Sequence, residues 1–292
     1  MTKTHRLIFK IVPAILATLI FVVTHELSAA QKEGDPEDQF RLGVASLEGK
    51  GMDKDIQKAG MWFRKAAEQG HARGENALGS LYCDGRGVSQ NYEEARKWFL
   101  KSADLGEPRA MYNLGRMEEK GLGRPVNMAK AIQWYDQADK KGLPQATMKL
   151  GEIYYFGDGG VKIDGLKAFH YMNKAAGSGS AEAENYLGAM YEGGIGTKQD
   201  AVAAAAWYRK AALQGFARAQ NNLGRLYIKG AGLPKDEVAG TIWLAFAFAN
   251  GDRNAETVLN EYSKIMEAAT LVTGKDRAKE MLARGLKIPE KL

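Results

Sequence analysis

The dipeptide Leu-Gly recurs along the chain at a nearly constant interval, and an aromatic residue recurs after it with the same period. Leu-Gly begins at Leu42, Leu78, Leu114, Leu150, Leu187 and Leu223, and the aromatic position holds Trp62, Trp98, Trp134, Tyr171, Trp207 and Trp243. Successive copies lie 36 residues apart, except that the fourth period has one extra residue. A fixed period of this length is typical of a solenoid built from helical hairpins.

Each period predicts two amphipathic helices. In the first, Ala219, Leu223 and Tyr227 follow Gly215 at intervals of four, which places them on one helical face. The second is expected to begin at an Asp or Asn residue, because these side chains accept a hydrogen bond from an unpaired backbone N–H at a helix N-terminus. That position holds Asp55, Asn91, Asn127, Asp164, Asp200 and Asp236. Alanines three before and four after the aromatic position, such as Ala204 and Ala211, continue an apolar stripe.

Paired glycines separate the two predicted helices, and they account for much of the high glycine content of 34 residues. The pairs are Gly49/Gly51, Gly85/Gly87, Gly121/Gly123, Gly157/Gly159, Gly194/Gly196 and Gly230/Gly232. They suit loops that need positive φ angles. No strand pattern precedes them and the third glycine of a dinucleotide motif is missing, so nucleotide binding is not expected. The extra residue of the fourth period is expected in its loop, at Gly159-Gly160.

The complete pattern resembles the Sel1-like repeat, a variant of the tetratricopeptide-type repeat. It reads G-x-A-x-A-x-x-x-L-G-x-x-Y, a G-x-G loop, then D-x-x-x-A-x-x-W-Y-x-K-A-A, and residues 200–212 and 215–227 come close to the ideal form. The resemblance implies an all-α, right-handed α-solenoid of tandem helix-turn-helix repeats. Six repeats are expected within residues 31–250, at about 34–69, 70–105, 106–141, 142–178, 179–214 and 215–250.

Residues 251–292 are expected to form a partial seventh repeat and a C-terminal cap, with a helix over 251–266 and a polar-faced cap over 275–286. Four residues depart from the pattern: Ser46 and Glu118 replace tyrosine, and Asp139 and Gly240 replace alanine. Local changes in packing are expected there. Some relatives carry a disulfide in every repeat, but Cys83 is the only cysteine here, so properties of that cysteine-rich branch are not expected.

The first 30 residues have the features of a signal peptide. Lys3, Arg6 and Lys10 precede an uncharged apolar run over residues 11–23, and Ser28-Ala29-Ala30 offers small residues for cleavage. The run is shorter than the roughly 20 residues that span a bilayer. The sequence therefore predicts an exported protein, periplasmic or secreted if the source is a Gram-negative bacterium, without stable membrane insertion after cleavage. The alternative is an uncleaved segment that tethers the protein to the membrane.

Composition and motifs argue against nucleic-acid binding and against catalysis. The net charge of +6 is mild and not concentrated as in a nucleic-acid-binding protein. His71 and His170 have no partner at metal-ligand spacing, and the motifs H-E-x-x-H, G-x-S-x-G and S-x-x-K are absent. The sequence predicts no enzyme activity, no metal and no cofactor.

The first helices of such a solenoid line its concave face, so residues offset from their core stripe are candidates for binding a partner. The candidates are Arg73, Arg109, Tyr112, Arg116, Gln145, Glu152, Tyr155, Arg218, Asn221 and Arg225. In two repeats a pair of arginines seven residues apart shares one helical face, suited to acidic side chains or C-terminal carboxylates of a partner. Alternatively, these arginines are solvated, or pair with Glu152 and Glu182.

The sequence thus predicts an adaptor or scaffold that binds a partner protein or peptide on the concave face. The resemblance implies a role in envelope assembly, signalling regulation or host interaction. Two alternatives remain open: a protein that binds or hydrolyses cell-wall fragments or β-lactams, suggested by the cysteine-rich branch of the family, and the membrane-tethered adaptor.

Overall fold

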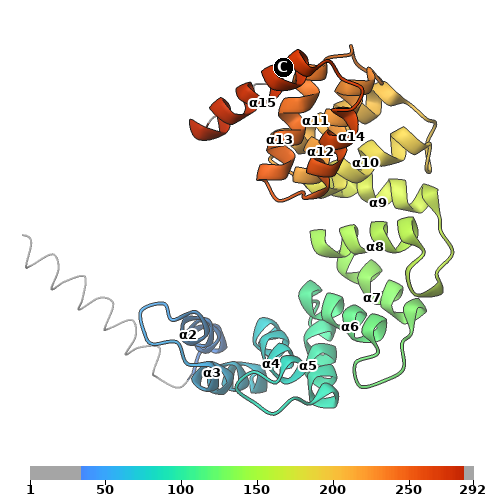
Figure 1. Ribbon diagram of the computed structural model, residues 1–292. Coiled ribbons are helices and arrows are strands. Elements are labelled where there is room, and N and C mark those ends of the chain that lie inside the picture. The colour runs from blue at the N-terminus through green and yellow to red at the C-terminus, as the bar shows by residue number, and fades with distance from the viewer. Residues whose placement is uncertain (1–33, 286–292) are drawn as a thin grey trace, which may run out of the picture. The chain divides into compact units, whose positions relative to one another are not determined.

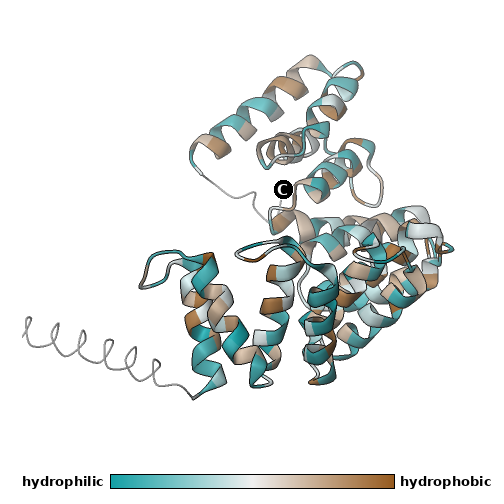
Figure 2. Ribbon diagram, turned by 90° about the horizontal axis from the view of Figure 1, so that it is seen from below, coloured by the Kyte–Doolittle hydropathy of each residue, from teal (hydrophilic) through white to brown (hydrophobic). Residues whose placement is uncertain are grey.

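The computed structural model describes residues 34–285, in which there are fourteen α-helices and no strand (Figure 1). This confirms the all-α solenoid class that the sequence predicts. The expected signal peptide lies outside the described residues. Along the helices, hydrophilic and hydrophobic segments alternate, as amphipathic helices require (Figure 2). No helix among those described has the length and apolarity needed to cross a membrane.

The chain divides into two compact units at Lys141 and Gly142. Unit 1 contains three helical hairpins: α2 (Pro36–Glu48) with α3 (Ile56–Glu68), α4 (Ala72–Asp84) with α5 (Tyr92–Asp104), and α6 (Pro108–Lys120) with α7 (Met128–Lys140). Unit 2 contains three more, α8 (Pro144–Phe156) with α9 (Gly165–Gly177), α10 (Ala181–Gly193) with α11 (Ala201–Leu213), and α12 (Ala217–Lys229) with α13 (Glu237–Ala249). It ends with α14 (Asn254–Tyr262) and α15 (Ala268–Ala283).

The predicted capping residues begin and end the helices as the sequence indicates. At all six Asp or Asn positions the side chain accepts a hydrogen bond from the backbone of the following turn, as Asp236 does from the Ala239 N–H at 2.9 Å. The first glycine of each loop pair ends the first helix in the left-handed conformation, with φ between 67° and 73°. The prediction of N-caps and positive-φ glycines is confirmed.

Each Leu-Gly glycine lies beneath a large side chain from the second helix of its own repeat. A Cβ atom added to Gly188 would lie 2.5 Å from Cδ1 of Tyr208, far inside van der Waals contact. The equivalent pairs are Gly43 with Phe63, Gly79 with Phe99, Gly115 with Tyr135, Gly151 with Met172 and Gly224 with Leu244. All six of these large side chains are at most 2% exposed. The glycine is therefore needed for the two helices to approach.

The aromatic position that defines the repeat is not the deepest position on the second helix. Trp62, Trp134 and Trp207 are only half-buried, whereas the residue after each of them is the one that covers the glycine. Trp98 and Trp243 are buried, and their indole N–H groups have no hydrogen-bond partner among the described residues, whereas the Phe, Met and Leu side chains over the glycines have no donor to satisfy. The two tyrosines reach acceptors: Tyr135 donates to Glu119 Oε2 at 2.5 Å and Tyr208 to Glu192 Oε2 at 2.8 Å.

The departures from the repeat pattern have local consequences. Glu118, in place of tyrosine, accepts a hydrogen bond of 2.5 Å from the Arg96 guanidinium, and both side chains are nearly buried. Gly240, in place of alanine, lets the helix pass Ile228, because an added Cβ would lie 2.5 Å from its Cγ1. The extra residue of the fourth repeat lies in the loop between α8 and α9, which forms a 3-10 turn over Asp158–Gly160. That placement is confirmed.

The segment expected as the C-terminal cap, residues 275–286, belongs in its described part to a longer helix. The helix α15 begins at Ala268 and runs through Gly274. Gly274 is buried where α15 meets α13, and a Cβ there would lie 2.6 Å from Cβ of Thr241. Gly274 is therefore a close-contact position, and α15 packs on α13.

Glu75 is a buried carboxylate that lacks the hydrogen-bond partner present at the equivalent position of three other repeats. In three other repeats the equivalent residue pairs with the C-cap residue of the second helix: Gln39 with Gln69, Glu184 with Gln214 and Gln220 with Asn250, at 2.7–2.9 Å. In the second repeat that C-cap is Leu105, which is 56% exposed. Glu75 is 3% exposed, its Oε2 has no partner, and burial raises the pKa of its carboxyl.

We predict that Gly188→Ala destabilises the fold by about 1–3 kcal/mol, because its methyl group meets the Tyr208 ring. Equilibrium unfolding in urea measures the effect. Gly177→Ala is the control, since Gly177 ends a helix in the same unit with nothing within 4 Å of an added Cβ. It should leave stability unchanged or raise it by up to ~1 kcal/mol. Equal effects at the two positions would contradict the packing described.

We predict that Leu105→Gln stabilises the protein by about 1 kcal/mol at pH 7, or roughly 2–4 °C in melting temperature, by donating a hydrogen bond to Glu75. Burial raises the pKa of the Glu75 carboxyl in the folded state, so the ionised side chain destabilises the fold when the pH is above that pKa. When the pH is below the pKa of the unfolded state, the carboxyl is protonated in both states and no longer destabilises the fold. The gain should therefore shrink as the pH falls towards 4. In a Glu75→Ala background the gain should vanish, and its persistence there would refute the pairing.

Candidate functional site

The predicted partner-binding residues lie on the first helices of the repeats, and each unit has its own set. In unit 1, Arg73 pairs with Glu37 at 2.5 Å and lies over the Phe40 ring, with 4.9 Å between the guanidinium carbon and the ring centroid. Arg109 and Arg116 are exposed and make no ion pair with any described residue. Of the three arginines predicted in unit 1, two are therefore available to a ligand.

Two further candidates in unit 1 are partly packed against the chain. Tyr112 is half-buried, with its ring centroid 5.2 Å from that of Tyr135. Beside it, Asn113 Nδ2 donates to Oδ1 of Asn76 on the preceding first helix, at 2.9 Å. Arg116 also lines a small cavity of ≈ 40 Å³ that includes Cys83. Arg109 and Arg116 thus lie on a helix that the Asn113–Asn76 hydrogen bond links to the preceding first helix.

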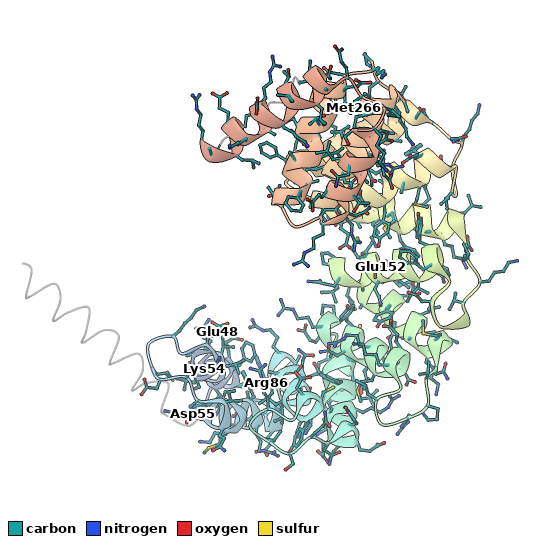
Figure 3. All side chains as sticks on the ribbon, in the orientation of Figure 1. Glu48, Lys54, Asp55, Arg86, Glu152 and Met266 are labelled. Atoms are coloured by element: carbon teal, nitrogen blue, oxygen red, sulfur yellow. The ribbon has the colours of Figure 1, made fainter. Side chains whose placement is uncertain are left out.

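In unit 2, Gln145, Glu152 and Tyr155 lie on α8, where Figure 3 labels Glu152. Gln145 is exposed, and Glu152 lies 3.9 Å from the ammonium of Lys149. Tyr155 packs edge-on against Tyr186 of α10, with centroids 5.4 Å apart. Burial, followed by the nearby carboxylates of Glu152 and Glu182, raises the pKa of Tyr186 to about 12. This end of the face is therefore aromatic and acidic.

The remaining three predicted residues line one polar hollow of ≈ 590 Å³ between α10, α12 and α14. Its walls are Asn185, Arg218, Asn221, Asn222, Arg225, Asp252, Asn254, Thr257, Val258 and Glu261. Arg218 is exposed and has no ion-pair partner among the described residues, and Arg225 is half-buried. The structure thus brings Arg218, Asn221 and Arg225 together, as predicted, and adds residues that the sequence did not single out.

Asn221 has a buried acceptor without a partner. The side chain is 5% exposed, its Nδ2 donates to Asp252 Oδ2 at 2.9 Å, and its Oδ1 has no hydrogen-bond partner. A carboxylate only accepts, so the amide nitrogen must face Asp252 and the oxygen must point elsewhere. Because an unpaired buried acceptor costs about 1–3 kcal/mol, a ligand that donates a hydrogen bond to this oxygen gains from it.

A series of polar contacts between α10, α11 and α12 positions side chains that line the hollow. Tyr208 donates to Glu192, and Glu192 Oε1 lies 3.8 Å from Arg225 Nη2. The Arg225 guanidinium donates to Asn222 Oδ1 at 3.2 Å, and Asn222 Nδ2 donates to Asn185 Oδ1 at 3.0 Å. Burial and the Glu192 carboxylate raise the pKa of the Tyr208 phenol, which therefore stays a donor at neutral pH. The Arg225 side chain is positioned before any ligand arrives.

The sequence could have revealed Asn113 and Asn222. Both stand within the segment R-A-x-x-N-L-G-R, which occurs only in the third and sixth repeats, at residues 109–116 and 218–225. The prediction used only the offsets that face away from the core stripe and passed over the next position. Asp252 lies in the link before α14, outside the helical pattern, and no periodic signal points to it.

Neither His71 nor His170 belongs, among the described residues, to a cluster that could bind a metal ion. His71 caps α4, accepting from the Gly74 N–H at 3.0 Å, and contacts Glu37 Oε2 through Nε2 at 3.0 Å. His170 is exposed and lies edge-on to Tyr171. Within residues 34–285 there is no group of three or more His, Cys, Asp or Glu arranged to hold a metal ion.

Comparison with known proteins assigns the family. The Sel1 repeat model matches six successive segments, residues 36–71, 72–107, 108–142, 144–180, 181–216 and 217–252, and the chain belongs to the Sel1 repeat family. Proteins of this family are helical repeat scaffolds that mediate protein–protein interaction. No curated protein matches the chain.

Solved structures with at least 30% identity to the chain include the following two. One is a protective antigen of uropathogenic Escherichia coli with an SLR fold, at 30% identity and a TM-score of 0.76; the match covers 89% of this chain and 56% of the antigen. The other is a Sel1 repeat protein from Oxalobacter formigenes, at 34% identity and a TM-score of 0.66, covering 74% and 88%. The chain thus spans little more than half the length of the antigen.

Proposed function

We propose that this protein is an adaptor that binds the carboxy-terminal end of a partner protein in the hollow between α10, α12 and α14. The observation that carries the proposal is the buried, unpartnered Oδ1 of Asn221, a residue that lines the same hollow as Arg218 and Arg225. The hollow therefore offers one acceptor and a cluster of positive donors at the same place. Membership of a family of interaction scaffolds supports a protein as the partner.

The end of a peptide matches this combination of groups. Its terminal carboxylate accepts hydrogen bonds from guanidinium groups, with geometry that allows two parallel bonds. Its last peptide N–H is a donor close to that carboxylate and can meet the Asn221 oxygen. An acidic side chain within a chain would supply the carboxylate without a fixed neighbouring donor, so the chain terminus is the better match.

The aromatic and acidic end of the same face gives the bound peptide a direction. Tyr155 and Tyr186 lie on α8 and α10, next to the hollow along the row of first helices of unit 2. Packed helices lie 8–10 Å apart and an extended chain rises ~3.3 Å per residue, so neighbouring helices meet residues about three apart in the ligand. Residues upstream of the terminus would therefore reach the tyrosines.

We also propose that the adaptor acts outside the cytoplasm. The basic, apolar and small-residue segments of residues 1–30 support export, and the likeness to a protective antigen is consistent with it. Mass spectrometry of the protein from its native cells tests this, since removal of about 30 residues is expected and an intact N-terminus would point to a membrane-tethered adaptor. The cell-wall and β-lactam alternative stays a prediction that no observation favours.

The peptide proposal predicts a specific binding result. A pool of fluorescein-labelled hexapeptides of mixed sequence with free carboxy termini should raise the anisotropy on titration with the protein, and the same pool with amidated termini should not. Arg218→Ala should weaken binding by roughly 10- to 100-fold, because a charge-assisted hydrogen bond contributes about 1.5–3 kcal/mol. Arg277→Ala, which removes the same charge from α15, should have no effect.

The free and amidated pools are expected to differ, and equal binding of the two would refute recognition of the terminus. Unchanged binding by Arg218→Ala would place the site elsewhere. Matching helical circular dichroism of the variants controls for misfolding. A crosslinking pull-down with the wild type and with Arg109, Arg116, Arg218 and Arg225 all replaced by alanine then asks whether one partner protein depends on the two arginine pairs.

A further inference from the structure

An apolar cleft of ≈ 370 Å³ lies between α13, α14 and α15, apart from the polar hollow. Its floor includes Leu244 and Phe248 of α13, and its sides include Leu259 of α14 and Leu282 of α15. Phe248 is 48% exposed and Leu282 is 39% exposed. Two large apolar side chains therefore face solvent within one concavity at the end of unit 2.

The cleft exists because the last helix is placed differently from the second helices of the six repeats. In each repeat the second helix packs along its own first helix, as α13 does along α12. The helix α15 instead packs against α13, where Gly274 meets Thr241. The helices α14 and α15 both pack on α13 (Figure 1) and line the cleft from two sides.

The charged residues at the rim of the cleft are basic on α15 and acidic on α14. Lys275 and Lys279 stand one turn apart on α15 and make no ion pair or hydrogen bond with any described residue. On the opposite wall the polar residues are Glu256 and Asn260 of α14. An occupant with an apolar body and a negative end near α15 would satisfy both the floor and the lysines.

We propose that this cleft binds a long-chain carboxylate, that is, a free fatty acid, with its chain along Phe248 and its head group at Lys275 and Lys279. The volume lies in the range of small-ligand sites, which are mostly apolar with a few placed polar groups. A single alkyl chain with a carboxylate at one end matches both the apolar floor and the two lysines of the cleft.

Isothermal titration calorimetry with dodecanoate, kept below its micelle-forming concentration, tests the proposal on the full protein. Binding is expected, and decanoate should bind roughly 15-fold more weakly, because each buried methylene changes affinity about fourfold. Ala249→Trp should abolish binding, since Ala249 is an exposed residue of the lining and the indole would fill the cleft without disturbing the core. Dodecyltrimethylammonium, with the opposite charge, should not compete.

The lysines are tested by a matched pair of double variants. Lys275→Gln with Lys279→Gln should weaken dodecanoate binding roughly tenfold at low salt. Lys198→Gln with Lys229→Gln removes the same charge from unit 2 outside the cleft and should leave binding unchanged. Equal losses in the two pairs, or binding that survives Ala249→Trp, would overturn the proposal.

Two other occupants give distinct results, and each would also overturn it. A second copy of the chain in the cleft would appear as a dimer in light scattering that Ala249→Trp converts to a monomer, with no heat on addition of dodecanoate. A membrane surface would appear as binding to phosphatidylglycerol vesicles without binding to the free acid. Neither result depends on whether peptides bind the polar hollow, because that site has its own variants.

Discussion

The contact between a glycine on the first helix and a large side chain on the second governs the geometry of every repeat. With no Cβ on the first helix, the ring of Tyr208 lies directly on the backbone at Gly188, and the same arrangement occurs in all six repeats. This fixes which face of each first helix points to its partner. The positions of the first helix that point away from this contact carry Arg109, Arg218 and the two asparagine pairs. The glycine contact therefore determines which residues form the candidate binding faces.

The residues of each repeat determine most of the fold, because the repeat is built from local signals. A capping side chain such as Asp236 and a positive-φ glycine such as Gly230 act within one turn of the chain, and both can be identified from the sequence. The course of the last helix depends on a contact with α13 that is distant in sequence. The sequence therefore did not indicate that Gly274 lies at a helix crossing, where an added Cβ would meet Thr241.

The candidate site could be predicted only in part, for a related reason. Helical periodicity indicates which residues point away from the core, and it correctly grouped Arg218, Asn221 and Arg225 around one hollow. It cannot indicate that Asp252, in a link between helices, takes the amide of Asn221 and leaves its oxygen unpaired. The two faces also share arginines and an amide pair yet differ in chemistry, since Tyr112 in unit 1 stands where unit 2 has Asn221.

The ion pair between Arg96 and Glu118 bears on how such an array evolves and how it could be engineered. Helical repeats are commonly duplicated or exchanged as modules, since each contacts only its neighbours. Here the second repeat supplies a nearly buried cation and the third supplies its anion, and no other repeat has a charged residue at either equivalent position. Inserting a foreign module between them would leave two buried charges unpaired, each costing about 3–5 kcal/mol. The second and third repeats must therefore be inherited, deleted or transplanted as one block.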